Sequence, residues 1–213
     1  MQHPEKGKVI DLSDATRKQL NSADPSIYVK IYPVDGYGNA DIVRQIMDIE
    51  KPDAIMHFTD PRYWTWLYQI EHEIRQKIPL IYYEIWDSQP APKYNRSFYE
   101  SCDALLAISK QTEIINKIVL PKENWYSLED LKNPNFDPSN KTLILYVPHG
   151  SNKKVFKPLD KNDSLLVDFK KKYFGNKEYD FILLYNNRNI HRKHPADIMV
   201  AYKLFCESLT PEQ

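Results

Sequence analysis

Glycine is scarce in this sequence, and its scarcity excludes two common nucleotide-binding motifs. The 213 residues include only five glycines, at Gly7, Gly36, Gly38, Gly150 and Gly175. Neither the dinucleotide-binding pattern G-x-G-x-x-G nor the phosphate loop G-x-x-x-x-G-K-[ST] can be formed from glycines at these positions. We therefore expect neither a standard NAD site nor the ATP hydrolysis of P-loop proteins.

Net charge, long apolar runs and cysteine are also missing or rare. Lys and Arg together number 29, as do Asp and Glu, so no net charge favours binding to nucleic acid. The longest apolar runs have the length of a strand, and Met1–Lys6 lacks the apolar core of a signal peptide. Only Cys102 and Cys206 are present, in segments expected to be buried, which is typical of a reducing compartment. The sequence therefore predicts a soluble, cytoplasmic protein without a transmembrane segment.

Apolar and aromatic residues are abundant enough for a folded core. They make up 42% and 13% of the chain, which excludes a disordered protein. Short apolar runs alternate with stretches of helical spacing, such as Ile42, Ile46 and Ile49. The predicted strands are 27–32, 54–58, 80–85, 103–108 and 143–147, and the predicted helices are 40–50, 63–76 and one that Ser109 opens as its N-cap. This order is typical of an α/β fold with a Rossmann-like parallel sheet and flanking helices.

Two polar stretches interrupt this alternation. Residues 122–141 are rich in Asn and Pro, so we expect an inserted loop there. The lysine-rich and weakly periodic stretch that ends at residue 179 indicates a linker with at most one short helix. After it come a predicted strand, 181–185, and a predicted helix, 195–207, whose first position suits Pro195.

The last predicted strand and helix form a single βα unit. One such unit cannot close a core, because its strand needs neighbours and its helix needs a sheet to cover. We therefore expect a second domain that is truncated in this sequence. The predicted organisation is a first domain at 1–158, a linker at 159–179 and the start of the second domain at 180–213.

A cluster of basic residues follows the last predicted strand. Arg188 lies at its carboxyl end, where ligands gather in α/β sheets, and Lys193 lies just before a helix N-terminus, whose N–H groups attract anions. This arrangement predicts a phosphate-sized binding site. The alternative is a solvated basic turn that binds nothing, since such turns are common on protein surfaces.

Three segments, taken together, resemble one known family. Residues 147–158 are V-P-H-G-S-N-K-K-V-F-K-P, Arg188 and Lys193 have the spacing of the pattern G-R-x-x-x-x-K-G, and 103–109 is a predicted strand that ends in serine. In this order the segments resemble the group 1 (family four) glycosyltransferases of the GT-B fold. The resemblance implies that the first domain lies on the acceptor side and that the second domain binds a nucleotide sugar.

The resemblance also implies a reaction and a donor site. The reaction is transfer of a sugar, as in hexosyltransferases, from a nucleotide diphosphate to an acceptor hydroxyl, with retention at the anomeric carbon. Arg188, Lys193 and Gly150 are implied to bind the diphosphate, because fixed cations stabilise the charge that develops as the bond to the sugar breaks. No Asp-x-Asp pair is present to hold a metal, so we expect a metal-independent reaction with no cofactor besides the donor.

The sequence departs from the family pattern around the basic motif. Asn187 and His194 stand where the family has glycine, and no pair of glutamates seven residues apart follows Lys193. The part of the family site that holds the donor sugar and the ribose is therefore missing. We expect this chain alone to bind the donor weakly or not at all, and to be inactive as a fragment.

Two carboxylates follow the third predicted strand and are the candidates for catalysis. Glu84 and Asp87 lie near its carboxyl end, so we expect them to orient the acceptor hydroxyl. The alternative for Asp87 is to cap a turn or a helix. His57 is interpreted as a core histidine, and Trp64 with its neighbours as packing aromatics that could otherwise stack on a ligand. The acceptor class stays open among sugars, lipids and proteins.

Two other classes of function compete with the enzyme. The first is a non-catalytic module of the same fold that binds a nucleotide or a protein partner, which the missing glutamates favour. The second is nucleic-acid binding through 171–174 and 188–193, which combine basic and aromatic residues. The zero net charge argues against the second, so we expect no nucleic-acid partner.

Overall fold

The chain divides into two compact units, Met1–Ser151 and Asn152–Gln213, and each is described by itself. The computed structural model describes residues 4–175, 177, 179 and 181–210. The boundary between the units falls inside the segment 1–158 that the sequence predicts as the first domain. Residues 1–3, 176, 178, 180 and 211–213, which belong to the predicted first domain, linker and second domain, lie outside the described residues.

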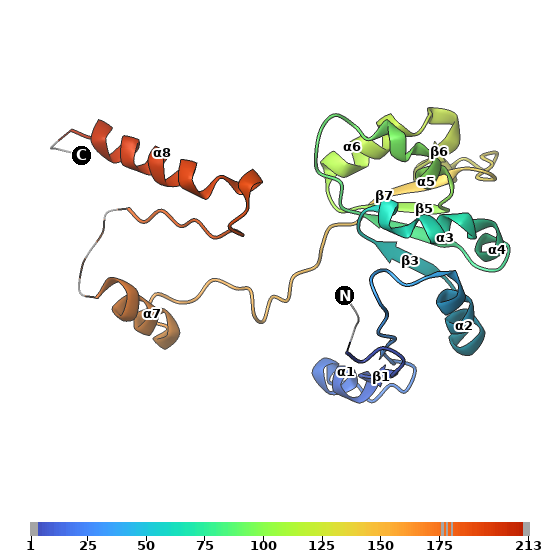
Figure 1. Ribbon diagram of the computed structural model, residues 1–213, viewed down its shortest axis with the longest axis horizontal. Coiled ribbons are helices and arrows are strands. Elements are labelled where there is room, and N and C mark those ends of the chain that lie inside the picture. The colour runs from blue at the N-terminus through green and yellow to red at the C-terminus, as the bar shows by residue number, and fades with distance from the viewer. Residues whose placement is uncertain (1–3, 176, 178, 180, 211–213) are drawn as a thin grey trace. The chain divides into compact units, whose positions relative to one another are not determined.

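The first unit contains a five-stranded parallel sheet (Figure 1). In spatial order its strands are β3 (Ile55–Phe58), β4 (Leu80–Glu84), β5 (Ala104–Ala107), β7 (Thr142–Tyr146) and β6 (Trp125–Tyr126). The predicted α/β class is confirmed, and the parallel sheet with flanking helices is consistent with a Rossmann-like fold.

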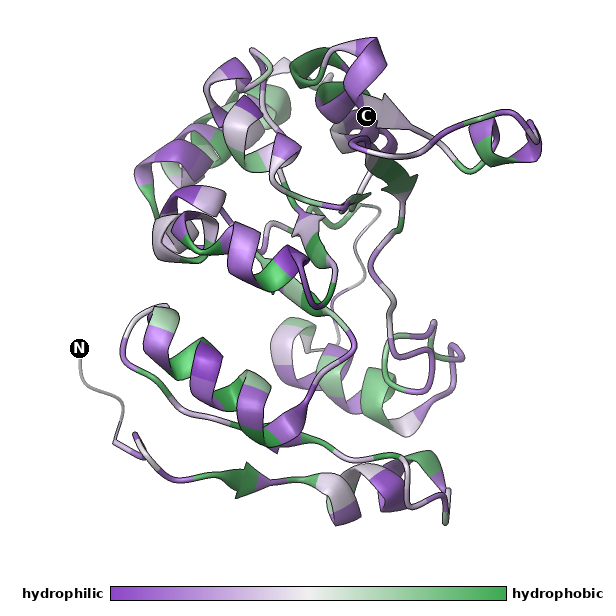
Figure 2. Ribbon diagram, turned by 90° about the vertical axis from the view of Figure 1, so that its right-hand side faces the viewer, coloured by the Kyte–Doolittle hydropathy of each residue, from purple (hydrophilic) through white to green (hydrophobic). Residues whose placement is uncertain are grey.

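Helices lie before and between the strands of this sheet. They are α2 (Ala40–Glu50) before β3, α3 (Thr65–Gln69) and α4 (Glu71–Arg75) before β4, α5 (Arg96–Glu100) before β5, and α6 (Lys110–Val119) after β5. The predicted N-cap of α6 is confirmed, because Ser109 Oγ accepts the Thr112 N–H at 3.0 Å. Figure 2 shows hydrophobic and hydrophilic bands alternating along the helices, as expected of helices with one apolar side. Within the described residues, no helix is long and apolar enough to cross a membrane.

The helices α3 to α6 pack on one face of the sheet. The chain steps in one direction from β3 to β4 to β5 and, through α6, to β6, and the rule that such crossovers are right-handed predicts their helices on the same side. The strands present to these helices a row of buried side chains, His57, Tyr82, Leu105 and Ile144. The helices contribute Leu67, Ile74, Tyr99 and Ile115 to the same core. The opposite face is less buried, and Phe58 on it is 45% exposed.

Asp103 joins several elements at the amino edge of the sheet. Its carboxylate accepts the Leu80 N–H at 2.7 Å and two hydrogen bonds from the Arg75 guanidinium at 3.0 and 3.1 Å. Its backbone donates to the Leu80 carbonyl at 2.8 Å and accepts from the Leu143 N–H at 3.0 Å. One residue therefore ties α4, β4 and β7 to the start of β5.

The N-terminal region differs from the prediction. The sequence predicts 27–32 as the first strand of the parallel sheet, but only β2 (Lys30–Ile31) forms there, and it pairs antiparallel with β1 (Ile10–Asp11) across α1 (Ser13–Leu20). Lys30 interrupts the apolar residues of this segment, and its ammonium binds the Glu50 carboxylate at 2.7 Å. An inner strand of a parallel sheet is apolar on both faces, which this segment is not.

Other sequence predictions for the first unit also need correction. The single helix predicted at 63–76 is a 3-10 turn, η1 (Pro61–Trp64), followed by α3 and α4, which are separated where Ile70 leaves the helical conformation. The predicted loop at 122–141 contributes β6 to the sheet, with 3-10 turns η3 (Lys122–Asn124) and η4 (Asp130–Lys132). Ile49, predicted on the apolar face of α2, is 67% exposed.

The described part of the second unit contains two α-helices and a segment of extended backbone, residues 181–185, which we call the extended segment. The helices are α7 (Ser164–Phe174) and α8 (Pro195–Ser208), and Pro195 occupies the first turn of α8 as predicted. The strand predicted at 181–185 belongs to no sheet in the described residues, because no other strand pairs with it there. Cys206 on α8 is exposed, whereas the prediction was burial; Cys102 in the first unit is buried as predicted.

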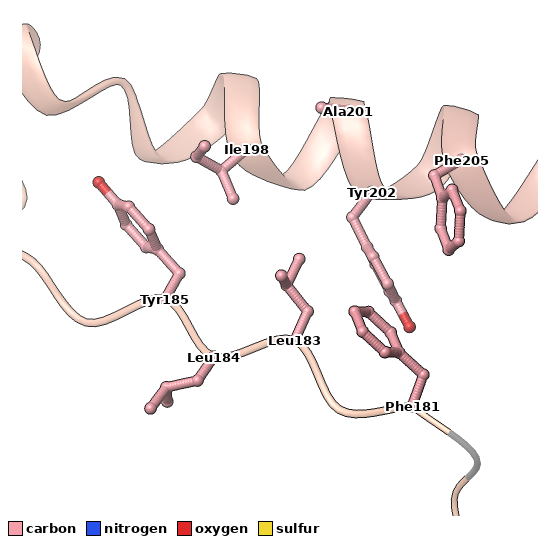
Figure 3. A pocket seen from close by; sticks show the side chains of 8 residues that line it. All are labelled: Phe181, Leu183, Leu184, Tyr185, Ile198, Ala201, Tyr202 and Phe205. Carbon is pink, nitrogen blue, oxygen red and sulfur yellow. The ribbon is translucent and has the colours of Figure 1, made fainter.

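The extended segment lies along α8 and forms an apolar groove of about 380 Å³ (Figure 3). Phe181, Leu183 and Tyr185 point toward the helix, and Leu184 points away from it. This alternation is the side-chain pattern of a β-strand, although the segment lacks a hydrogen-bonded partner strand within the described residues. Leu184 is 84% exposed, so both faces of the segment are poorly covered.

Two neighbouring residues of α6 provide a test of the core. Ile115 is fully buried, whereas Ile114 is 58% exposed. We expect Ile115→Ala to lower the free energy of unfolding by about 2–5 kcal/mol, because it removes buried methylenes and leaves a cavity. Ile114→Ala is the matched control and should change it by less than about 0.5 kcal/mol. Urea unfolding of both variants measures the difference, and equal losses would contradict the placement of α6.

Amide hydrogen exchange tests the extended segment. Its backbone N–H groups make no hydrogen bonds within the described residues, whereas those of β4 pair on both sides in the sheet. We expect the amides of 181–185 to exchange much faster than those of Leu80–Glu84, because exchange follows local opening. Slower exchange at 181–185 than in β4 would contradict this assignment.

Candidate functional site

The candidate site in the first unit is a pocket at the carboxyl ends of β3 and β4. Its volume is about 180 Å³, and we call it the edge pocket. It is lined by Thr59, Asp60, Tyr82, Ile85, Trp86, Asp87 and Ser88. The loops after two neighbouring parallel strands therefore build it, at the edge where ligands of α/β proteins bind.

Thr59 begins the first of these loops in a strained conformation. Its φ is +82°, a left-handed value that a β-branched residue rarely adopts and that costs about 1–3 kcal/mol. Neighbouring hydrogen bonds hold it there. The Trp64 indole N–H donates to the Phe58 carbonyl at 3.0 Å, and Asp60 caps η1 by accepting the Arg62 N–H at 3.0 Å. The left-handed backbone at Thr59 changes the direction of the chain, so that Thr59 and Asp60 line the edge pocket.

Asp60 and Arg62 form an ion pair beside this pocket. Arg62 Nε lies 2.9 and 3.1 Å from the two carboxylate oxygens, and Nη2 also donates to Oδ2. The guanidinium holds the pKa of Asp60 below its usual value. The same guanidinium lies 5.8 Å from the ring centroids of Trp86 and Tyr94. The pair therefore links the loop after β3 to the loop after β4.

Glu84 is not at the surface of this edge, although the sequence predicts it as a group that orients the acceptor. It is the last residue of β4 and is fully buried on the helix-covered face. The Tyr99 hydroxyl donates to its Oε1. Burial raises the pKa of Glu84 to about 8, against the opposing effect of Tyr99 and Asn116. With this pKa, Glu84 is largely protonated at neutral pH. It is not among the residues that line the edge pocket.

Asp87 lies where the sequence predicts it, at the open edge. It is exposed and lines the edge pocket. Its loop is fixed from the start of α6, because Gln111 Nε2 donates to the Asp87 carbonyl at 3.1 Å and the Thr112 hydroxyl donates to the Trp86 carbonyl at 2.8 Å. A carboxylate in this position can accept a hydrogen bond from a bound hydroxyl.

His57 is a core histidine, as the sequence analysis interprets it, and Trp64 and Trp66 pack half-buried against the core, whereas Tyr63 is 55% exposed. His57 is 3% exposed, its Nε2 lies 2.6 Å from the Tyr68 hydroxyl, and its ring stacks on Tyr82 at 4.4 Å. Burial lowers the pKa of His57 to about 4, so the ring is neutral. Trp64 is held by its bond to the Phe58 carbonyl.

The segment after β7 lies at the same edge of the sheet. The Tyr83 hydroxyl donates to the Val147 carbonyl at 3.0 Å and lies 2.9 Å from Nδ1 of His149. Gly150, predicted to bind the diphosphate, follows in the same loop. A Cβ added at Gly150 would meet no atom within 4 Å, so the surroundings leave space there.

Arg188 and Lys193 belong to one turn of the second unit. Arg188 is exposed, and Lys193 is half-buried in the 3-10 turn η5 (His191–Lys193). The Tyr185 hydroxyl donates to the Lys193 carbonyl at 2.7 Å, which fixes the turn against the extended segment. His194, at φ +45°, then leads into α8 without a side-chain cap. Arg188 and Lys193 therefore both lie in the stretch that leads into α8, whereas Gly150, Glu84 and Asp87 belong to the first unit.

The sequence analysis misses part of the edge pocket. Thr59, Asp60 and Arg62 follow β3 in the way that Asp87 follows β4, so the same rule about carboxyl ends applies to them. A local signal was also present, since Asp60 before Pro61 is typical of a helix N-cap. Within the described part of the chain, no three His, Cys, Asp or Glu side chains gather as a metal site requires.

A scan against protein-family models and searches of curated proteins and of solved structures each find no match to this chain. The class of protein therefore comes from the fold alone. The chain is an α/β protein with a five-stranded parallel sheet and flanking helices.

The buried Glu84 gives a prediction for the pH dependence of stability. Its pKa is 4.5 in an unstructured chain and about 8 when folded, so the stabilising effect of the protonated group is complete below pH 4.5 and is lost as the pH rises to 8. We expect Glu84→Gln, which cannot ionise, to be more stable than the wild type by on the order of 3 kcal/mol at pH 7, with the two converging below pH 4.5.

Urea unfolding across this pH range measures the effect. Glu129→Gln is the control, because the Glu129 side chain is 76% exposed and should give the wild-type curve. If the free energies of unfolding of the wild type and Glu84→Gln differ by the same amount at every pH between 5 and 8, Glu84 ionises without penalty, contrary to its burial.

Proposed function

We propose that this chain is part of a glycosyltransferase that moves a sugar from a nucleotide diphosphate to an acceptor hydroxyl, with retention and without a metal. The observation that supports this most is the position of Arg188 and of Lys193, the last residue of η5, between an apolar extended segment and the start of α8. Such a stretch suits a phosphate group, because cations and a helix N-terminus both attract anions. The resemblance of 147–158 and of 103–109 to the GT-B family supports the same proposal.

The two cations have different roles in this proposal. Arg188 is exposed and can bind two phosphate oxygens through its planar guanidinium, whereas Lys193 acts as a point charge. As the bond to the sugar breaks, negative charge grows on the diphosphate, and both cations stabilise it. The donor is the substrate, and no further cofactor takes part in the proposed reaction.

Asp87 is the proposed acceptor-side residue. It is exposed in the edge pocket, so its carboxylate can accept a hydrogen bond from the attacking hydroxyl and orient it. Glu84 is buried beneath the same loop and bonded to Tyr99, so we assign it a positioning role at the end of β4. Two free cysteines fit a reducing compartment, and we propose a cytoplasmic location on that basis.

The second candidate is a non-catalytic module that binds a protein partner. It is favoured by the exposed apolar side chains of the second unit, among them Leu184 and Met199 at 84% and 72% exposure. Turnover of a nucleotide sugar separates the two candidates, since a binding module releases no nucleoside diphosphate.

Substitution of Arg188 tests the donor site. In the complete gene product, we expect Arg188→Ala to lower kcat/KM for the nucleotide sugar by about 30- to 1000-fold, because it removes a donor to a developing anion. Lys193→Ala should act in the same direction. Release of nucleoside diphosphate from a panel of nucleotide sugars is the measurement.

Arg192→Ala is the matched control, because Arg192 is an exposed cation of the same turn that the proposal does not use. It should retain most of the activity, and EDTA should leave the rate unchanged. Equal losses for Arg188→Ala and Arg192→Ala would indicate an unspecific basic turn. Loss of activity in EDTA would contradict the metal-free reaction.

A further inference from the structure

We propose that the edge pocket binds one neutral sugar ring, so that the acceptor is a carbohydrate. The inference rests on the proposed function for the reaction, and on the pocket itself for the chemical class of the ligand. Three properties of the pocket lead to it, namely its size, its aromatic wall and its distribution of charge.

The size of the pocket suits a single ring. At about 180 Å³ it is smaller than the sites of about 300–1,000 Å³ that enclose drug-sized ligands. A nucleotide or a long lipid chain therefore exceeds it. Its mouth is open to solvent at Asp87 and Ser88, which are both exposed, so the rest of a longer saccharide can extend outward.

The aromatic wall of the pocket is Trp86. Its indole N–H donates to the Ser88 carbonyl at 2.9 Å, and its ring meets Tyr94 edge-on at 6.0 Å, so its orientation is fixed. The face of an aromatic ring carries partial negative charge, and the C–H groups of a sugar ring carry partial positive charge. A fixed indole therefore attracts the apolar side of a pyranose.

The charges favour hydroxyl groups over phosphate. Asp60 and Asp87 both line the pocket, its lining residues include no Lys or Arg, and the neighbouring Arg62 is already paired with Asp60. A phosphate would meet the carboxylate of Asp87 with no cation among the lining residues to offset it, which is repulsive. A hydroxyl can instead donate to that carboxylate in a charge-assisted hydrogen bond. The preferred ligand is thus neutral and rich in hydroxyls.

Binding of simple sugars to the full chain tests the inference without any nucleotide. The probes are the methyl glycosides of glucose, galactose, mannose and N-acetylglucosamine at millimolar concentration, observed by saturation-transfer NMR. We expect at least one to bind, and Trp86→Ala and Asp87→Ala to weaken it by about tenfold or more. Trp86→Phe keeps an aromatic face and should retain binding, which separates loss of the wall from loss of folding.

Tyr28→Ala is the matched control, because Tyr28 is an exposed aromatic residue outside the pocket. It should bind the glycoside as the wild type does. The inference is overturned if no glycoside binds, if Trp86→Ala binds as well as the wild type, or if glucose 6-phosphate binds more tightly than the methyl glucosides. Nucleotide-sugar turnover is measured separately in the complete gene product, so sugar binding without turnover there refutes only the proposed function, and turnover without sugar binding refutes only the inference.

Discussion

The right-handed crossover between parallel strands is the constraint on which the first unit depends. Since the chain steps in a single direction from β3 to β4 to β5 and, through α6, to β6, the crossover rule predicts α3 to α6 on one face. The row formed by His57, Tyr82, Leu105 and Ile144 is buried for this reason, and even a histidine within it is held neutral. The same rule brings the loops after these strands to one edge, where the edge pocket forms.

Alternation along β4 explains why two nearby carboxylates have different environments. Leu80, Tyr82 and Glu84 face the helices, so Glu84 enters the core with Tyr99 as its partner. Asp87 comes after the strand has ended and lies in a loop fixed by α6. A carboxyl group that is protonated in the interior and a carboxylate that faces solvent therefore lie three residues apart. Only the second can contact a ligand at the edge.

The sequence predicts the parallel sheet well because β4, β5 and β7 are short apolar runs between helices with clear start signals such as Ser109. The prediction fails for segments whose structure depends on pairing with a neighbouring strand. The segments 27–32 and 181–185 have strand-like composition, but a strand also needs a hydrogen-bonded neighbour, which composition cannot supply. For the site, the rule about carboxyl ends finds Asp87. Whether Glu84 points into the core depends on which set of alternate residues of β4 faces the helices, and a single sequence does not define this.

Asp103 fixes the amino edge of the sheet, whereas the edge pocket lies at the carboxyl edge. The sequence can therefore vary at one edge independently of the other. Its bonds to Leu80, Arg75 and Leu143 fix the amino edge through one carboxylate and one peptide unit. The loops that build the edge pocket contribute nothing to this junction. Insertions and substitutions after β3 and β4 can therefore accumulate without loosening the sheet, so lineages with different ligands can arise from one framework.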